Sequence, residues 1–551
     1  MIKKLILLLF LISTLQSIEK KFSIIIPSYN VDKICNKIIH SISSQNYKNY
    51  EVYFIDDGST DLTYFKAKNY LKTLPDELRS KFHIKHYKNH KGPVERLYKT
   101  IRGLNDDDIV IYFEGNTWLE KRALVKFNNA YQKNNSWLVY GQDLEIFTNK
   151  KGRCKKLSSK NLFTNSMRGK NWKRCKIKSF YAKLFKKIKL EDFFFRGDFV
   201  NENFDSAYMF PMMEMAHKHA FFIKKIVCNH IQDYEYRNSS RACNKSPFRC
   251  NSYIKNASPY KKIKSLFTDR KGKENNVDLI IFSYHRPIQL LALLESLYKY
   301  EHDFNKISVI YRSDTHPFNC AYNDVKRNFP KVQFIKQSSN PHCDFKPLLL
   351  KNLKNNSKYV AFAVDDIIIK NNLNIKKCLN ALDKSRAYFF SLRLGKNINY
   401  CYMGGFKQKV PNYISLNDEI IGWQIDSAKG DWTYYNSLDM TIYKKRKTLK
   451  DLQMIHFKHP NDLEINWNAF HDKHKNFRTK KKTGLSFKTS KCLNIPVNIV
   501  NISDNRNMNL MSPNDLLRKY NDGYKIDISK YFKFKNVSVH EEISLHFTKR
   551  K

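Results

Sequence analysis

Residues 22–30 read FSIIIPSYN and residues 51–61 read EVYFIDDGSTD, and these two stretches decide the fold class. Each begins with a run of β-branched and aromatic residues, typical of a buried strand, and each ends in polar turn residues. Between them Ile34, Ile38 and Ile42 recur every four residues, which predicts an amphipathic helix. A strand, a helix and a second strand in this order indicate a mainly parallel, doubly wound α/β sheet.

The rest of the first half continues the same alternation. His83–Tyr87 and Ile109–Phe113 are predicted strands, and the turn at 91–93 leads into a helix that carries Arg96. The fourth strand ends in Glu114–Asn116. Ligands of such sheets bind beyond the carboxyl ends of the strands. The polar turns of this half therefore lie where a binding site is expected.

The second half repeats this plan. The interval from Phe22 to Asp57 is almost the same as the interval from Asp278 to Asp314, which predicts a structural duplication. The Lys- and Asn-rich stretch 261–276 is the predicted linker. The strands predicted in the second half are Asp278–Phe282, Ser308–Tyr311, Val332–Ile335 and Tyr359–Val364.

The composition is that of a folded protein with a strong positive charge. The 551 residues are 42% hydrophobic, which excludes a disordered polycation. Lys and Arg exceed Asp and Glu by 99 to 51, a formal net charge of +48. This excess fits an anionic membrane surface, nucleic acid or a general enrichment in lysine. No nucleic-acid-binding motif accompanies it, so we expect no specific nucleic acid partner.

The N-terminus has the pattern of a secretory signal. Two lysines within Met1–Lys4 precede the apolar run Leu5–Ile12, and small polar residues follow. Residues 1–18 are therefore predicted to be a signal peptide or N-terminal anchor, although a buried first element has the same composition. We expect an exported or membrane-associated protein, or one on the cytoplasmic face of a membrane. The 11 cysteines are scattered, and the close pair Cys243 and Cys250 implies no disulfide framework.

The first half resembles the family 2 glycosyltransferases, which have the GT-A fold. The resemblance covers about residues 22–145 and rests on residues 25–30, 54–61 and 114–119. It implies that the Asp56–Asp57 turn holds the base of a nucleotide sugar, because a carboxylate accepts hydrogen bonds from ring N–H groups. The donor-site residues that it implies are Pro27, Tyr29, Asp56, Asp57 and Arg96.

The metal motif of the family is altered in the first half. Two carboxylates flanking one residue normally hold a divalent cation, whereas this chain has Glu114 and Asn116 at those places. A lower metal affinity is expected. Further along, Asp205, with Glu202 as second choice, is the predicted general base for the acceptor hydroxyl. A solvated acidic turn beside a helix is the alternative interpretation of both.

The second half looks like the exostosin-type GT-A domains at residues 280–287 and 364–367. The resemblance implies that Asp365 and Asp366 hold Mn²⁺ or Mg²⁺ against a diphosphate, although paired aspartates can instead cap a helix. Basic residues near the strand ends can neutralise diphosphate charge or lie on the surface. The donor-site and basic residues singled out here are Arg286, Arg312, Asp314 and Lys346.

Two later carboxylates, Asp439 and Glu464, are further candidates for the general base. Trp423, Trp432 and Trp467 are either sugar-stacking residues or, more commonly for this residue type, part of the core.

The sequence predicts an α/β protein with two tandem GT-A modules, 19–260 and 277–551. The expected function is hexosyl or N-acetylhexosaminyl transfer from a nucleotide sugar to a glycan or lipid-linked acceptor, with a divalent cation. The second module has the better metal motif and is favoured for the chemistry. The alternative is a non-catalytic relative that binds nucleotide or glycan. A nucleotidyltransferase needs a Gly-rich phosphate loop, and none follows the first strand of either half.

Overall fold

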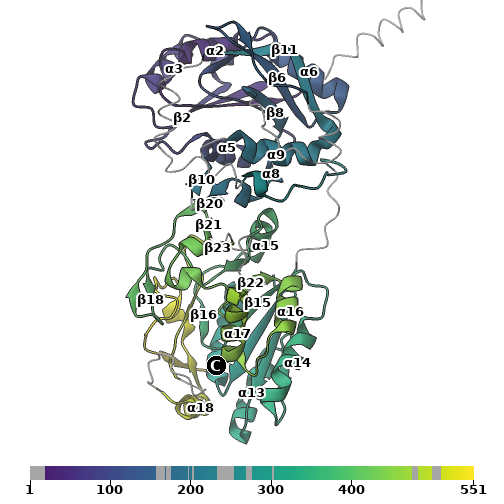
Figure 1. The fold of residues 1–551 in the computed structure, drawn as a ribbon. Coiled ribbons are helices and arrows are strands. Elements are labelled where there is room, and N and C mark those ends of the chain that lie inside the picture. Colours follow the sequence, from purple (N-terminus) through teal and green to yellow (C-terminus); the bar gives the residue numbers. More distant parts are fainter. Residues whose placement is uncertain are drawn as a thin grey trace, which may run out of the picture. The chain divides into compact units, whose positions relative to one another are not determined.

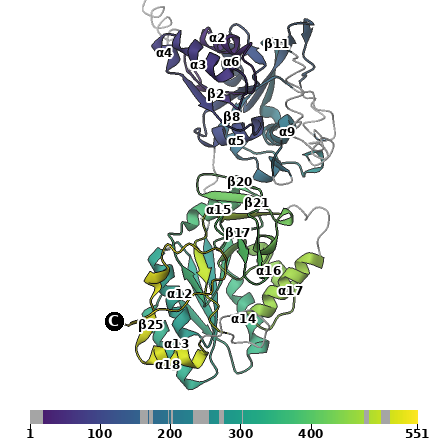
Figure 2. The same cartoon turned by 90° about the vertical axis from the view of Figure 1, so that its left-hand side faces the viewer.

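The computed structural model describes residues 19–156, 168, 175–195, 198–200, 204–231, 254–267, 276–300, 303–473, 482–498 and 511–550. The chain forms two compact units. The first unit comprises Met1–Phe195 and Phe199–Asp269, and the second comprises Arg196–Asp198 and Arg270–Lys551. Figures 1 and 2 show the two units from two directions. The predicted leader at residues 1–18 lies outside the described residues.

The sheet of the first unit has the strand order β3-β2-β1-β4-β8-β6-β11-β5. The strands from β3 to β4 are parallel, β8 is antiparallel to β4 and β6, and β11 is parallel to β6. The short β7 (Lys150–Lys151) pairs with β6. The bounds are β1 Phe22–Ser28, β2 Tyr50–Asp56, β3 Phe82–His86, β4 Ile109–Phe113, β5 Thr117–Leu119, β6 Leu138–Glu145, β8 Ile177–Tyr181 and β11 Ala220–His230.

Helices cover both faces of this sheet. Ile38 and Ile42 of α2 are buried against the strands together with Phe127 of α6, which explains the four-residue spacing of the isoleucines. Figure 1 shows α5, α8 and α9 on the opposite face. The bounds are α2 Cys35–Ser43, α3 Thr63–Lys72, α4 Asp76–Arg79, α5 Pro93–Arg102, α6 Ala123–Asn134, α8 Ala182–Lys186 and α9 Phe204–Ala216.

The sheet of the second unit has the order β14-β13-β12-β15-β22-β17-β23-β21-β20. Again the strands from β14 to β15 are parallel, β22 is antiparallel to β15 and β17, and β23 is parallel to β17. The bounds are β12 Val277–Tyr284, β13 Lys306–Arg312, β14 Gln333–Lys336, β15 Tyr359–Val364, β16 Ile367–Ile369, β17 Phe389–Ser391, β20 Tyr413–Ser415, β21 Ile420–Gln424, β22 Thr441–Lys444, β23 Thr483–Phe487 and β24 Cys492–Asn494.

The second unit has a core on each face of its sheet, because alternate residues of β12 point to opposite sides. Its C-terminal segment returns to the separate two-stranded sheet of β16 and β24, where Asn494 pairs with His540. The remaining bounds are α12 Pro287–Tyr300, α13 His316–Asn328, α14 Pro341–Leu353, α15 Ile375–Lys384, α16 Lys445–Met454, α17 Pro460–Lys473, α18 Pro513–Asn521, β25 Tyr524–Ile526 and β26 Phe547–Lys549.

The two units share a backbone path at the end of the first strand. Asn30 follows β1 and His285 follows β12, and both have positive φ angles, 50° and 54°, which residues other than glycine seldom adopt. The registers of β1 with β4 and of β12 with β15 place Glu114–Asn116 in the same position as Val364–Asp366. The strands β5 and β16 begin one residue after these turns. The prediction of an α/β fold with two similar modules is confirmed.

A disulfide joins Cys154 to Cys175, just before β8. The sequence analysis did not identify this pair, because neither cysteine lies in a recognisable spacing motif. The pair that it noted, Cys243 and Cys250, lies outside the described residues. Within the part of the chain that the structure describes, no helix has the length and apolar character needed to cross a bilayer.

Candidate functional site

The carboxylate of Asp57, directly after β2, holds the loop that leads into α5. The backbone N–H groups of Lys91 and Gly92 donate to it at 3.2 and 2.7 Å, Arg96 Nε donates to Oδ1, and His90 Nδ1 lies 3.0 Å from Oδ2. Burial alone would raise the pKa of Asp57, but the hydrogen bond from His90 and the charge of Arg96 lower it below its usual value. Asp57 is therefore ionised and fully engaged by donors of the protein.

Asp56 is also buried and bonded within the protein. It accepts hydrogen bonds from the backbone of Ser59 at 3.1 Å and from His86 Nδ1 at 2.7 Å. The ring of Tyr29 lies 4.1 Å from the ring of His90, at the end of β1. The acidic turn is thus edged by two histidines and a tyrosine, whose rings are more accessible than the carboxylates.

The turn after β4 approaches β1 closely. The N–H of Gly115 donates to the carbonyl of Pro27 at 3.1 Å, and a Cβ at Gly115 would lie 2.8 Å from Ser28 Oγ. Glycine is required here because a side chain would displace the backbone of β1. Glu114 is buried beside this contact. The ends of β1, β2 and β4 therefore meet at one edge of the sheet, as the sequence predicted.

Further polar groups surround this turn. The amide of Asn116 donates to the carbonyl of Ile231 at 3.1 Å, and its oxygen accepts from Thr117 Oγ1 at 3.2 Å. His230 Nδ1 and Asp143 Oδ2, at the ends of two further strands, lie 3.4 Å apart. Burial, together with nearby positive charge, lowers the pKa of His230 to about 4. The sequence analysis missed both residues of this pair, because their strands join the sheet through long-range pairing.

Asp205 lies at the start of α9 in a buried ion pair. Both of its carboxylate oxygens accept from Lys178 Nζ at 2.8 Å, and Tyr208 donates to Oδ1 at 2.6 Å. Lys178 has no exposed surface. This predicted general base is therefore neutralised inside the protein. Glu202, the second choice, lies outside the described residues.

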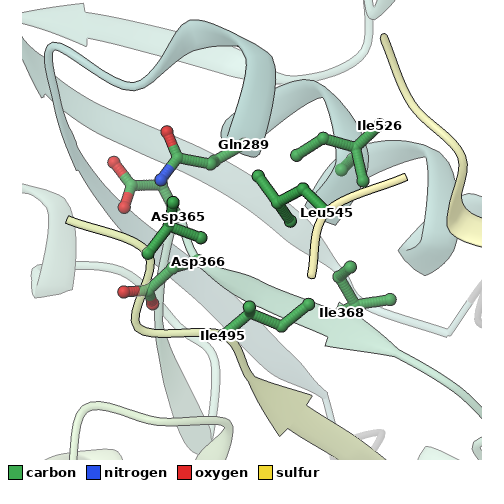
Figure 3. A pocket seen from close by; sticks show the side chains of 9 residues that line it. Gln289, Asp365, Asp366, Ile368, Ile495, Ile526 and Leu545 are labelled. Atoms are coloured by element: carbon green, nitrogen blue, oxygen red, sulfur yellow. The ribbon is translucent and has the colours of Figure 1, made fainter. Parts of the chain in front are cut away.

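In the second unit, Asp365 and Asp366 directly follow β15 and share one arginine. Arg286 Nη1 lies 3.1 Å from Asp365 Oδ1 and 3.2 Å from Asp366 Oδ2. The other oxygens accept from the backbone of Tyr284 at 3.2 Å and from Asn494 Nδ2 at 2.8 Å. Burial raises the pKa of both aspartates, although the charge of Arg286 opposes the rise. Figure 3 shows both side chains at one end of a small, otherwise largely apolar pocket.

The two predicted bases of this unit are brought together by the fold. Glu464 of α17 accepts a hydrogen bond from the backbone of Leu438 at 3.0 Å, one residue before Asp439. Burial and the charge of Asp439 raise the pKa of Glu464 to about 7. Asp439 Oδ2 lies 3.7 Å from Arg393 Nη1 and 3.6 Å from His540 Nε2. Burial lowers the pKa of His540, so Arg393 is the cationic neighbour of this carboxyl pair. A carboxyl pair beside an arginine is a chemically suitable acceptor site.

In the first unit, the polar turns after β2 and after β4 both lie in a segment that matches a known protein family. Residues 23–194 match the model of glycosyl transferase family 2. The family 2 segment includes the acidic turn after β2 and the turn after β4. It covers less than half of the chain.

Two relatives have sequences similar to parts of this chain. The bifunctional glycosyltransferase pgtA of Dictyostelium discoideum is 31% identical over 225 residues, which are 36% of this chain and 29% of that protein. Glycosyltransferase GlyA of Streptococcus pneumoniae is 43% identical over 44 residues, which are 8% of this chain and 6% of that protein. The chain thus spans less than a third of the length of each relative.

Two solved structures resemble part of the chain. TarS 1–349 of S. aureus, in complex with UDP-GlcNAc, is 16% identical with a TM-score of 0.29, over 39% of this chain and 59% of that one. The mannosyltransferase PcManGT of Pyrobaculum calidifontis, in complex with GDP-Man and Mn²⁺, is 16% identical with a TM-score of 0.30, over 44% of this chain and 67% of that one. Each covers less than half of the present chain.

Outside the family 2 segment, Asp314 lies at the edge of the second unit's sheet. It accepts hydrogen bonds from Arg312 Nε and from the hydroxyl of Tyr284, both at 2.8 Å. These bonds outweigh its partial burial and lower the pKa of Asp314. Lys346 donates to the backbone carbonyl of Ile455 at 2.6 Å. Asp314 is accessible to a ligand, whereas Lys346 is held by the backbone before α17.

The three tryptophans singled out in the sequence are fully buried. Trp423 and Trp432 pack edge to face, with ring centroids 4.9 Å apart, and the indole N–H of Trp423 donates to the carbonyl of Trp432. Trp467 belongs to the same core, where its ring lies 5.0 Å from the ring of Tyr443. The core interpretation is confirmed for all three.

Metal binding was predicted at Glu114 with Asn116 and at Asp365 with Asp366. Among the residues that the structure describes, no group of three or more His, Cys, Asp or Glu side chains is arranged to hold a metal ion. At the second turn an arginine already bridges the two carboxylates. The described side chains therefore do not fit a divalent cation there.

Proposed function

We propose that the chain is a glycosyltransferase that moves a sugar from a nucleotide diphosphate sugar to a hydroxyl acceptor. One observation carries this proposal: the family 2 segment, residues 23–194, contains both polar turns at the carboxyl edge of the first sheet. This edge is where doubly wound sheets bind nucleotides. The glycosyltransferase relatives support the same activity.

The first unit is proposed to bind the donor. Because its oxygens are engaged, Asp57 positions the loop at His90 and the guanidinium of Arg96. Arg96 also lies 3.6 Å over the ring of Tyr87, so its orientation is fixed. The rings of Tyr29 and His90 then offer a face on which a base can stack. Asp57 accepts a hydrogen bond from a ring N–H group of that base in place of one of its hydrogen bonds to the loop.

The second unit is proposed to be a second, exostosin-like GT-A module that performs the transfer. Its support is the repeated strand order and the carboxyl pair Asp439 and Glu464. In this reaction the acceptor oxygen bonds to the anomeric carbon and its proton passes to Glu464. The bond from that carbon to the diphosphate breaks, and the electron pair leaves with the diphosphate. Arg393 opposes the negative charge that develops there.

A second candidate function applies to the first unit, which would bind nucleotide or glycan without turnover. The specific observation is that Asp205 is neutralised by Lys178 and Tyr208. A carboxylate held in this way is a poor base for the proton of the acceptor hydroxyl, because its protonation would leave Lys178 as an unpaired buried charge. Binding without chemistry in the first unit is compatible with transfer in the second.

The compartment and the acceptor are further parts of the proposal. The disulfide between Cys154 and Cys175 supports an oxidising, secretory compartment, which agrees with the signal-like residues 1–18. The net charge of +48 favours work near an anionic membrane surface. We therefore propose hexosyl or N-acetylhexosaminyl transfer to a glycan or lipid-linked acceptor by an exported or membrane-associated protein.

The test uses the full chain and a panel of UDP- and GDP-sugars. Binding to the native state raises the melting temperature, and turnover releases the nucleotide diphosphate. One donor is expected to do both in the presence of an acceptor. Arg96→Met is expected to weaken donor binding in the first unit, and Glu464→Gln to slow release strongly while leaving binding intact. Release of nucleotide with none of the donors, with and without Mn²⁺, would exclude the transfer activity.

Matched controls separate these effects from general damage. Asp76→Asn alters a largely exposed carboxylate of the first unit, and Asp418→Asn an exposed one of the second. Both variants are expected to bind donor and release nucleotide as the wild type does. A loss of release in Asp418→Asn equal to that in Glu464→Gln would count against a specific role for Glu464.

A further inference from the structure

We infer that Arg286 is the built-in cation of the Asp365–Asp366 turn, and that the second unit binds a nucleoside diphosphate without a divalent metal. The inference rests on the proposed function and departs from the predicted metal site. A bridging metal needs oxygens of both carboxylates within about 2.0–2.6 Å of one point. Here the guanidinium nitrogen Nη1 lies at hydrogen-bond distance from both, 3.1 and 3.2 Å, and fills that place.

Hydrogen bonds to Asn498 hold the guanidinium of Arg286 in this place. Its Nε donates to Asn498 Oδ1 at 3.0 Å, and its Nη2 donates to the carbonyl of the same residue. The side chain of Asn498 in turn donates to the carbonyl of Met511 at 3.0 Å. The backbone N–H of Arg286 donates to the hydroxyl of Tyr322 at 3.1 Å. Arg286 is therefore fixed at the start of α12 and is only 9% exposed.

The four oxygens of the aspartate pair are all satisfied in this arrangement. Arg286 donates to one oxygen of each aspartate. The backbone N–H of Tyr284 donates to the second oxygen of Asp365, and the side chain of Asn494 donates to the second oxygen of Asp366. Removing the guanidinium would leave two buried, adjacent carboxylates without a counter-charge, which is unfavourable. A metal is the obvious replacement only when the arginine is absent.

The first unit provides an internal comparison. By the strand registers and the shared left-handed residues Asn30 and His285, the position of Arg286 corresponds to Val31. Val31 is a buried apolar residue, and Asn116 stands where Asp366 does. The arginine and the aspartate pair thus occur together in one unit and are both missing in the other. This co-occurrence is expected if the two aspartates need the guanidinium.

A different residue is placed to meet the diphosphate. Arg393 contacts Asp439 at 3.7 Å and Asp431 at 3.8 Å, which are ion-pair distances longer than hydrogen bonds. Within the described ranges its guanidinium donates no hydrogen bond to the protein, so its N–H groups can donate to phosphate oxygens. Arg286 is accordingly a positioning residue, and Arg393, a largely buried side chain near Asp439 and Glu464, is the residue proposed to contact the diphosphate.

The experiment titrates the full chain with Mn²⁺ alone and measures free Mn²⁺ by electron paramagnetic resonance. Wild type and Asp365→Asn/Asp366→Asn are expected to bind the same number of ions. Arg286→Ala is expected to bind one more ion per chain, and the triple variant to lose it again. One ion bound by wild type and lost in Asp365→Asn/Asp366→Asn would overturn the inference. Equal binding by wild type and a folded Arg286→Ala would also overturn it.

A measurement on the wild type alone covers the case in which the variants do not fold. With Fe²⁺ in place of Mn²⁺, added hydrogen peroxide is reduced to hydroxyl radicals that cut the chain beside a bound ion, and ascorbate returns the Fe³⁺ formed to Fe²⁺. No cleavage near residues 364–367 is expected, and specific cleavage there would overturn the inference. These results are independent of turnover. Failure of the proposed function would appear instead as the absence of nucleotide release with every donor.

Discussion

Asp439 lies just before β22 and Glu464 in α17, yet the charge of Asp439, added to burial, raises the pKa of Glu464 to about 7. The backbone N–H of Leu438 binds Glu464 at 3.0 Å and so brings the two carboxyls together. A carboxylate with a pKa near neutrality is a better proton acceptor than an ordinary glutamate. The pair therefore has the properties of a general base and its tuning residue.

The pH profile of transfer tests this relationship. Glu464 accepts a proton only when ionised, so activity is expected to fall as the pH drops below about 7. Asp439→Asn removes the neighbouring charge, lowers the pKa of Glu464 and shifts the acidic limb to lower pH. Glu464→Gln is expected to lose roughly 10²–10⁴-fold in rate. An acidic limb at the same pH in wild type and Asp439→Asn would contradict the coupling.

The buried pair Lys178 and Asp205 makes a strong prediction about stability. Lys178→Met leaves the carboxylate buried without its partner, which is expected to cost about 3–5 kcal/mol. Hydrogen exchange of the amides of β4 and β8 in urea measures the loss in the first unit. Glu95→Gln, which breaks the surface pair with Lys99, is the control and is expected to change stability by less than about 0.5 kcal/mol. Similar losses in both variants would argue against a buried ion pair.

The contact between His90 and Asp57 leads us to expect a shifted titration of the His90 ring, which NMR can follow. The hydrogen bond to Asp57 outweighs burial and raises the pKa of His90 above 6.5. In Asp57→Asn burial remains without the carboxylate, so the pKa of His90 is expected to fall below 6.5. The stability from this contact is present below pH 6.5 and is lost as the pH rises through the raised folded-state value. Since the pKa of Asp57 is lowered from 3.8, its own contribution is present above pH 3.8 and is lost as the pH falls through the folded-state value.

Gly115→Ala tests the close approach of the turn after β4 to the end of β1 in the first unit. The added Cβ would lie 2.8 Å from Ser28 Oγ and 3.0 Å from Ser28 Cα, so the end of β1 must shift. A loss of about 1–3 kcal/mol and weaker donor binding are expected. Gly103→Ala is the control, because its nearest neighbour, the carbonyl oxygen of Thr100, is 3.5 Å away. Donor binding unchanged in Gly115→Ala would show that this turn does not shape the donor site.

The parallel part of each sheet could be predicted because its strands are apolar runs that end in polar turns. β15 was predicted with its observed bounds, whereas β3 and β14 are shifted by one residue. The antiparallel part was missed. β8 carries the buried Lys178, and a lysine inside a strand indicates a surface position unless its partner, Asp205, is known.

The same reasoning limits what could be predicted of the site. Asp439 and Glu464 were recognised as acidic residues, but nothing in the sequence showed that they meet. Arg393 and His540 were missed because each reaches Asp439 from a different part of the chain. His540 arrives on the C-terminal segment through its pairing with Asn494, and no periodic pattern marks that return.

The left-handed residues Asn30 and His285 give both units the same main-chain bend before different side chains. The two units therefore share a backbone framework, and the side chains that follow the strand ends differ between them. Because a side chain at Gly115 would displace the end of β1, each turn keeps residues that its own unit can accommodate. A single polypeptide can in this way hold two unlike binding preferences, each free to change while the other is kept.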